Sequence, residues 1–239
     1  MSDEPKHIVS SFEADLKKLQ DRIAFMGGMV ELAVADATKA LTEHNDGLAT
    51  QVIENDKKID SEQHGIEQFA VQLLALRQPV ADDLRQVIQA LKVVTDLERV
   101  GDYAANIAKR SIVINQVANN FPLAGLAQMA RLVQQNLKAS IDTVGEADPQ
   151  KAVSVWRADQ MVDDLYNAIF RELITYMMED PRNISACTHL MFIAKNLERI
   201  GDHTTNMAEL TYYAITGENL PDFRPKSDMT STYVHTAKN

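Results

Sequence analysis

The sequence is poor in the residues that interrupt helices. It contains 9 glycines and 7 prolines in 239 residues, about 7% together, where average usage gives roughly 12%. Few turns are therefore available to divide the chain, and long helices are favoured. Proline is excluded from helix interiors, and between the seven prolines apolar residues recur with helical spacing. No segment of the sequence shows the alternation expected of a strand.

The sequence also has little cysteine and no long hydrophobic run. Its one cysteine, Cys187, excludes an internal disulfide and fits a reducing compartment. The polar start, 1–6, is followed by no apolar stretch that resembles a secretory signal. The most apolar stretch, 184–194, is far shorter than the roughly 20 residues that span a bilayer. We therefore expect a cytoplasmic protein without direct membrane insertion.

An excess of basic residues is missing as well. The chain has 24 Lys and Arg against 34 Asp and Glu, a net charge of −10. Both halves, divided at residue 117, are acidic, with 13 basic against 19 acidic residues and 11 against 15. A nucleic-acid-binding surface normally shows the opposite sign, so we expect no nucleic-acid partner.

What is present is a series of helical segments. The prolines and the apolar periodicity predict six helices, near 8–44, 47–77, 82–117, 122–146, 149–179 and 185–216. Asp46 and Asp148 stand where N-caps of the second and fifth helices are expected, and Pro149 would occupy the first position of the fifth. Residues 218–239 are predicted to form a mobile tail.

An internal duplication organises these helices. The segment 96–102, DLERVGD, recurs 100 residues later as NLERIGD at 196–202, and each is followed by an asparagine, Asn106 or Asn206. Upstream, Asp56 and Asp60 recur as Asp159 and Asp163 at an offset of 103. The repeat predicts an all-α fold of two tandem three-helix bundles, 1–117 and 118–217. Gly101 and Gly201, inside helices, indicate close helix contacts.

Polar ridges border the apolar stripes of both repeats. Residues four apart lie one above the other on a helix, so neighbouring antiparallel helices can bring four carboxylates together. Like charges at this spacing destabilise a helix, and oxygen-rich sites suit hard metal ions. The sequence therefore predicts metal ligands in each repeat: Asp56, Asp60, Glu98, Asp102 and Asn106, and Asp159, Asp163, Glu198, Asp202 and Asn206.

Other interpretations of the acids stay open. They can be solvated, or they can pair with Arg99, Arg199 and nearby lysines. We interpret His203 as a surface histidine and His189 as a core residue. The sequence lacks a phosphate-binding glycine loop, a nucleophile elbow and a zinc-type cysteine cluster, so we expect neither catalytic residues nor an organic cofactor. A binding or regulatory protein is favoured over an enzyme.

The sequence closely resembles the PhoU family of bacterial phosphate-specific transport accessory and regulatory proteins, over nearly the whole chain. The similarity rests on the segments MGGMVE at 26–31, RQP at 77–79 with DLR at 83–85, the two LERxGD segments, and YMMED at 176–180. It implies two similar three-helix bundles, assembled as a homodimer. It also implies a cytoplasmic negative regulator of phosphate uptake and of the phosphate-starvation response (the Pho regulon).

The resemblance further implies partners and metals. The partners would be the ATPase subunit of the ABC phosphate importer and the phosphate-sensing histidine kinase, which place the protein peripherally at the inner membrane. The acidic motifs of the family are associated with Fe, Mn, Mg or other ions, Zn and Ca included, and they match the eight carboxylates above. Asn196, in place of Asp96, is a difference that predicts unequal sites. The alternatives are a metal-dependent enzyme or metal-storage bundle, and a purely structural scaffold.

Overall fold

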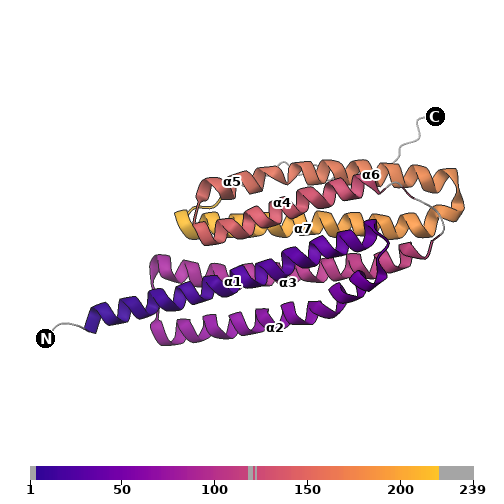
Figure 1. Cartoon of the computed structure of the whole chain (residues 1–239). Coiled ribbons are helices and arrows are strands. Elements are labelled where there is room, and N and C mark those ends of the chain that lie inside the picture. The colour runs from indigo at the N-terminus through magenta and orange to yellow at the C-terminus, as the bar shows by residue number, and fades with distance from the viewer. Residues whose placement is uncertain (1–3, 118–120, 122, 221–239) are drawn as a thin grey trace.

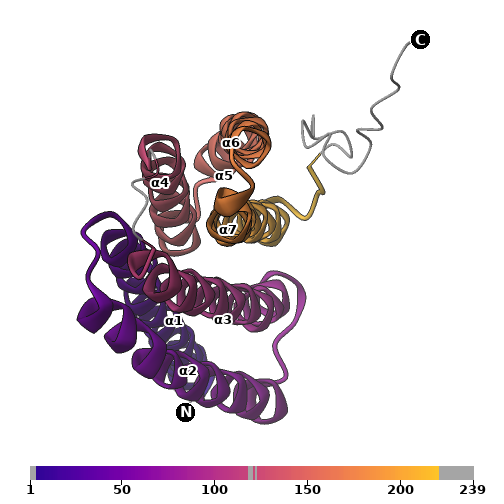
Figure 2. The same ribbon diagram turned by 90° about the vertical axis from the view of Figure 1, so that its right-hand side faces the viewer.

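The structure, a computed structural model, describes residues 4–117, 121 and 123–220. The predicted all-α architecture is confirmed: two three-helix bundles lie side by side with their long axes nearly parallel (Figures 1 and 2). The predicted tail is described only as far as residue 220. The helices are α1 (Glu4–Thr42), α2 (Asp46–Arg77) and α3 (Ala81–Asn115) in the first bundle, and α4 (Ala124–Glu146), α5 (Pro149–Ala158), α6 (Gln160–Glu179) and α7 (Ile184–Thr216) in the second, with a short 3-10 turn, η1 (Pro181–Asn183), before α7.

The helix predicted over 149–179 is interrupted at Asp159, which separates α5 from α6. The backbone of Asp159 keeps right-handed helical angles (φ −66°, ψ −26°). The N–H of Val162 donates to the Asp159 carbonyl at 2.9 Å, a tighter bond than the α-helical pattern, and the N–H of Asp163 donates to it at 3.2 Å. The interruption is therefore a local irregularity in one continuous rod, and no proline or glycine marks it in the sequence.

Capping chemistry fixes the starts of α2 and α5. Asn45, and not the predicted Asp46, caps α2: its Oδ1 accepts the N–H of Leu48 at 2.9 Å. The Asp46 carboxylate instead accepts a hydrogen bond from Asn115 at 2.7 Å and ties α2 to the end of α3. The predicted cap at Asp148 is confirmed, because its Oδ1 accepts the first N–H groups of α5. Neighbouring Asn and Asp side chains can both cap a helix, so the sequence could not separate positions 45 and 46.

Gly101 and Gly201 permit close helix contacts in the two bundles, as predicted. A Cβ atom on Gly101 of α3 would lie 3.1 Å from Ile59 Cδ1 of α2. A Cβ atom on Gly201 of α7 would lie only 2.6 Å from Asp159 Oδ1. Both distances are shorter than ordinary contacts, so the two helix pairs pack this closely because residues 101 and 201 have no side chain.

Helices α3 and α7 make the most extensive contact of any two helices, and they join the bundles. The paired positions run in opposite directions along the two helices. From residue 89 to 96 of α3 the partner on α7 changes from 211 to 203, and from 96 to 110 it changes from 203 to 189. A spacing of seven or eight residues is typical of an antiparallel coiled coil. Side-chain pairs across this seam include Gln89–Thr211 (2.8 Å), Asp96–His203 (2.7 Å) and Arg110–His189 (3.3 Å).

His203 is therefore not the surface residue that the sequence predicted. Its side chain is 20% exposed, its Nδ1 lies 2.7 Å from Asp96 Oδ1, and its ring lies 5.6 Å from that of Tyr103. In the repeat, Asp96 corresponds to Asn196 and His203 to Tyr103. The two repeats therefore differ at both members of this pair: where one side of the seam pairs Asp96 with His203, the equivalent positions hold Asn196 and Tyr103.

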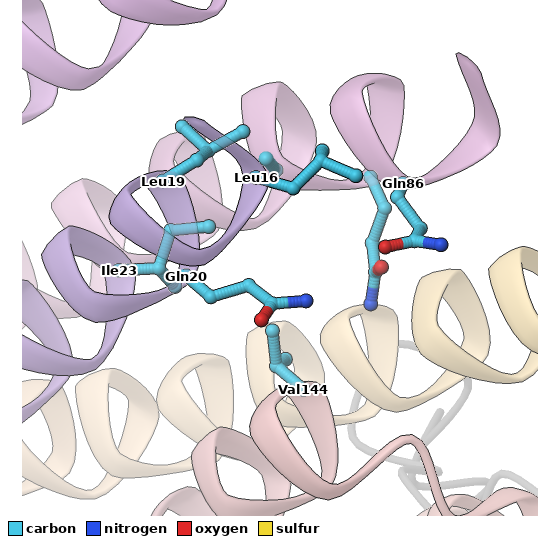
Figure 3. Close-up of a pocket in the computed structure, with 8 residues that line it drawn as sticks. Leu16, Leu19, Gln20, Ile23, Gln86 and Val144 are labelled. Carbon is cyan, nitrogen blue, oxygen red and sulfur yellow. The ribbon is translucent and has the colours of Figure 1, made fainter. Parts of the chain in front are cut away.

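A second contact joins the bundles between α1 and α4. A Cβ atom on Gly27 would lie 2.8 Å from Ile141 Cγ2, so this glycine admits α4 closely. Beside it, a cavity of about 20 Å³ is closed by α1, α3 and Val144 of α4. Figure 3 shows the carboxamides of Gln20 and Gln86 at this junction. The volume suits about one water molecule, which needs such polar partners.

The helices of the described ranges, 4–117 and 123–220, contain no stretch long and apolar enough to cross a membrane.

Replacement of Gly201 tests the close contact between α7 and Asp159. We expect Gly201→Ala to lower the free energy of unfolding by about 1–2 kcal/mol, because the clash outweighs the gain in helix propensity. Urea unfolding followed by circular dichroism measures the effect. Gly28→Ala is the matched control, since a Cβ atom there meets nothing within 4 Å; it should stabilise by about 0.5–1 kcal/mol. Equal stabilisation by both substitutions would contradict the packing argument.

Candidate functional site

The four predicted carboxylates of the first bundle form one electrostatic cluster, called cluster 1 here. Asp56 and Asp60 project from α2, and Glu98 and Asp102 from α3. The charge of Asp56 is destabilised by Asp60 and Asp102, and the charge of Glu98 by all three other acids. The two ridges therefore face each other across the α2–α3 contact.

Asp56 is the carboxylate of cluster 1 whose pKa is raised most. Its Oδ1 is buried, and within the described residues it has no hydrogen-bond partner. The oxygen lies 3.5 Å from where a Cβ atom of Gly101 would stand, so it faces the backbone of α3. Burial first, and then the charges of Asp60 and Asp102, raise the pKa of Asp56 from 3.8 to about 6, although Lys109 opposes the shift.

Arg99 offsets part of the repulsion at cluster 1. Burial and Asp102 raise the pKa of Glu98, and Arg99 counteracts them. The guanidinium lies 3.5 Å from Glu98 and 3.2 Å from Asp102. The Arg99 side chain is 55% exposed, so these ion pairs stabilise the fold only slightly. The predicted alternative of arginine pairing thus holds for Arg99, whereas Arg199 lies over the Tyr103 ring at 5.7 Å.

The second bundle carries the equivalent acids, called cluster 2 here: Asp159, Asp163, Glu198 and Asp202. The first three are buried, with 2%, 3% and 5% of their surfaces exposed. Asp159 lies against Gly201 as Asp56 lies against Gly101. The two clusters therefore occupy matching places in the repeat, and cluster 2 is the more deeply buried.

A lysine that the sequence analysis missed belongs to cluster 2. Lys195 Nζ lies 2.7 Å from Glu198 Oε1 and 5.0 Å from the centre of the Tyr166 ring. The equivalent residue of the first repeat is Thr95, which donates its hydroxyl to the carbonyl of Leu91. The sequence indicates this lysine only through the repeat, because Lys195 stands where the first repeat has Thr95. Cluster 2 therefore has a resident cation at a position where cluster 1 has none.

The two predicted amide ligands stand apart from this arrangement. Asn106 and Asn206 are exposed on the next turn of each ridge. In the described part of the chain, no hydrogen bond joins either amide to a cluster carboxylate. Asp96, whose difference from Asn196 predicted unequal sites, pairs with His203 in the seam between the bundles.

The donor atoms of the clusters suit a hard metal ion. Carboxylate oxygens are the ligands that Mg²⁺, Ca²⁺ and Mn²⁺ prefer, and the buried Asp56 Oδ1 lacks another partner among the described residues. Over those same residues, however, no three His, Cys, Asp or Glu side chains are arranged as a set that could hold a metal ion. The clusters therefore fit a cation in chemistry, without the spacing of a complete ligand set.

The fold and the clusters define a class: a duplicated helical-bundle protein with a set of carboxylates in each half. The PhoU domain model matches residues 23–111 and 126–211. A phosphate-specific transport system accessory protein PhoU homolog of Caulobacter vibrioides is 47% identical over 227 residues, which cover 95% of this chain and 99% of that protein. A homologue of the same name from Rhizobium meliloti is also 47% identical, over 95% and 96% of the two chains.

Solved structures agree with these sequence relatives. The crystal structure of PhoU from Pseudomonas aeruginosa superimposes with a TM-score of 0.84 at 39% identity, over 87% of this chain and all of that one. The phosphate transport system regulatory protein PhoU from Streptococcus pneumoniae gives 0.82 at 31% identity, over 88% and 99%. The chain belongs to the PhoU family, whose members named here are accessory and regulatory proteins rather than enzymes.

The raised pKa of Asp56 predicts a pH-dependent stability. Between about pH 4 and pH 6 the folded state binds a proton that the unfolded state has lost, so stability falls as pH rises through this window. We expect Asp56→Asn to raise the free energy of unfolding by roughly 1 kcal/mol at pH 7.5. Below pH 4 the difference should vanish.

Denaturant unfolding in chelator-containing buffer at several pH values measures this difference. Asp21→Asn, on the exposed side of α1, is the control and should show no such pH-dependent gain. A pH-independent difference between Asp56→Asn and the unsubstituted protein would contradict the burial argument.

Proposed function

We propose that this chain is a cytoplasmic negative regulator of phosphate uptake and of the phosphate-starvation response. In this role it acts as an adaptor between the ATPase subunit of an ABC phosphate importer and a phosphate-sensing histidine kinase. One observation carries the proposal: proteins named for phosphate-specific transport match this chain over nearly their whole length. The partners would hold the protein peripherally at the inner membrane.

The duplicated fold supports an adaptor role. Each bundle carries a group of carboxylates, of which Glu98 and Asp102 in the first and Asp202 in the second are partly exposed, and the α3–α7 seam joins the helices that carry them. Basic surfaces of a partner would be attracted to these groups. The adaptor transmits a signal only if it binds two states of a partner with different affinities, so the phosphate status must change the partner's conformation.

We also propose that cluster 1 binds a divalent or ferric ion, Fe, Mn, Mg, Zn or Ca, more tightly than cluster 2. Asp56, Asp60, Glu98 and Asp102 would hold it, and the ion would supply positive charge that relieves their repulsion. In cluster 2, Lys195 already supplies a positive charge to Glu198. Because Lys195 has no equivalent in cluster 1, where Thr95 stands, we expect the metal ion to bind more tightly there.

Metal analysis tests the metal proposal. We expect protein purified without chelator, or reloaded with Mn²⁺, to hold an ion that Asp102→Asn removes and the matched Asp202→Asn largely retains. Thr95→Lys, which copies the lysine of cluster 2, should weaken binding at cluster 1. Inductively coupled plasma mass spectrometry and titration calorimetry measure both effects. Equal loss in the two Asp→Asn variants would refute the inequality, and many ions per chain would favour the metal-storage alternative.

Binding to purified partners tests the adaptor proposal independently. We expect the cytoplasmic part of the kinase and the importer ATPase each to bind the chain, with affinities that differ at least fivefold between nucleotide-bound and nucleotide-free partner. Surface plasmon resonance provides these affinities. The Asp102→Asn and Asp202→Asn double variant should bind more weakly, because it removes one charge from each cluster. Absence of binding to both partners, with folded protein, would reject the adaptor role.

A further inference from the structure

The middle of α1 is apolar on the side that faces away from its own bundle. From Ile23 to Ala35 the sequence reads IAFMGGMVELAVA, and Glu31 is its one charged residue. The inner face is buried in the core, as expected. Phe25 and Leu32, however, are 63% and 60% exposed. A helix that is apolar on nearly all sides is normally covered on all sides, so this outer face lacks a cover.

A groove runs along the exposed pair. It lies between α1 and α2, has a volume of about 290 Å³, and is lined on one side by Phe25, Met29 and Leu32 and on the other by Val52 and Ile59. The spacing of Phe25, Met29 and Leu32 is that of one stripe along a helix. A second helix with apolar residues at the same intervals would fit such a groove.

Gly28 stands in the middle of this outer face. Its neighbour Gly27 is explained by the chain itself, because α4 packs against it through Ile141. Gly28 is exposed, and a Cβ atom there would meet nothing within 4 Å. Glycine inside a helix is destabilising relative to alanine, and nothing in the described chain requires it at position 28. Its absent side chain would, however, admit another helix closely.

The far flank of the face carries an exposed arginine. There α1 and α4 border a groove of about 310 Å³ lined by Glu31, Ala35, Gln134, Gln135, Arg131 and Lys138. Arg131 is exposed and has no ion-pair partner among the described residues, whereas Lys138 lies 3.5 Å from Asp142 and its charge also acts on Glu31. Asp142 and Glu31 therefore offset the charge of Lys138, and Arg131 remains as the uncompensated cation of this flank. The α2 flank is closer to neutral, since Asp36 and Lys58 both line it.

We propose that this face of α1 is a docking site for an amphipathic helix of a partner protein. The apolar side of that helix covers Phe25 and Leu32 and passes closely over Gly28. Its carboxylates meet Arg131 on the α4 flank. The site uses neither carboxylate cluster, so it is independent of the proposed metal binding and of the acidic docking surface.

Designed peptides provide a defined probe. A fluorescent amphipathic peptide of about 18 residues, long enough to reach across the face as a helix, carries leucine at i, i+3, i+4 and i+7 and glutamate along one flank. We expect it to bind the full chain, as measured by fluorescence anisotropy. Phe25→Ser and Gly28→Leu should each weaken binding at least tenfold, and Arg131→Glu should weaken it at least fivefold. Leu76→Ser, at another exposed apolar position, is the control and should have no effect.

The variants separate docking from folding. Position 28 has open space around it, so Gly28→Leu should leave the circular dichroism spectrum and the midpoint of unfolding intact or improved while it loses peptide affinity. A merely structural role for Gly28 would not produce that combination.

Three results would overturn the proposal. One is no binding of the glutamate peptide, or equal binding by the Phe25→Ser and Gly28→Leu variants. Another is tighter binding of a lysine-for-glutamate peptide that Phe25→Ser leaves unchanged, which would direct the peptide to the carboxylate clusters. The third is a dimer in light scattering that Gly28→Leu dissociates, because the face would then be occupied by a second copy of this chain.

Discussion

In each bundle one carboxylate of the cluster lies at a glycine contact between two helices. At Gly101 and Gly201 the absent side chain lets the carboxylates of Asp56 and Asp159 lie against the neighbouring helix. The same close packing that stabilises the bundle therefore desolvates a charged group, which raises its free energy. A positive charge beside each cluster lowers this free energy, and each cluster has one: Arg99 in the first and Lys195 in the second.

The two halves compensate in different ways, although they derive from one repeat. In cluster 1 the positive charge comes from Arg99, whose side chain is largely exposed to solvent. In cluster 2 it comes from Lys195, which is partly buried and pairs with the buried Glu198. An exposed arginine is screened by water and salt, whereas a partly buried lysine is screened less. The two repeats therefore place their cations differently, and the duplication does not give two identical clusters.

The α3–α7 seam joins the two bundles, whose clusters differ in their cations. Both helices carry cluster residues, and the seam between them is held by polar pairs, Asp96–His203 among them. A polar pair in a packed interface has few alternative partners, so a displaced helix must leave the pair intact or break it.

Sequence patterns predicted the features that depend on local periodicity. The repeated LERxGD segments predicted two bundles, and the i, i+4 ridges identified the acids that meet across α2 and α3. Features that depend on which faces meet could not be predicted in this way. His203 has the surroundings of a surface residue in the sequence, and its pairing with Asp96 follows only from the docking of the bundles. The irregularity at Asp159 likewise has no local signal, because neither a proline nor a glycine stands at the interruption. Lys195 was detectable only by comparison with Thr95, since its i, i+3 spacing from Glu198 is common on exposed helices.

The placement of charge and of exposed apolar surface bears on the adaptor role. An adaptor that serves two proteins needs two surfaces that can be occupied without mutual exclusion. The carboxylate clusters lie at the α2–α3 and α6–α7 contacts, whereas Phe25, Gly28 and Leu32 lie on the outer side of α1, between α2 and α4. The clusters attract cations and basic surfaces, and the α1 face suits an apolar helix with acidic flanks. Partners that use these two surfaces would be selected by opposite chemistry, so neither would compete for the other's place. Helix α1 also packs against α3 and α4, so a partner on its outer face would bind a helix that contacts both bundles.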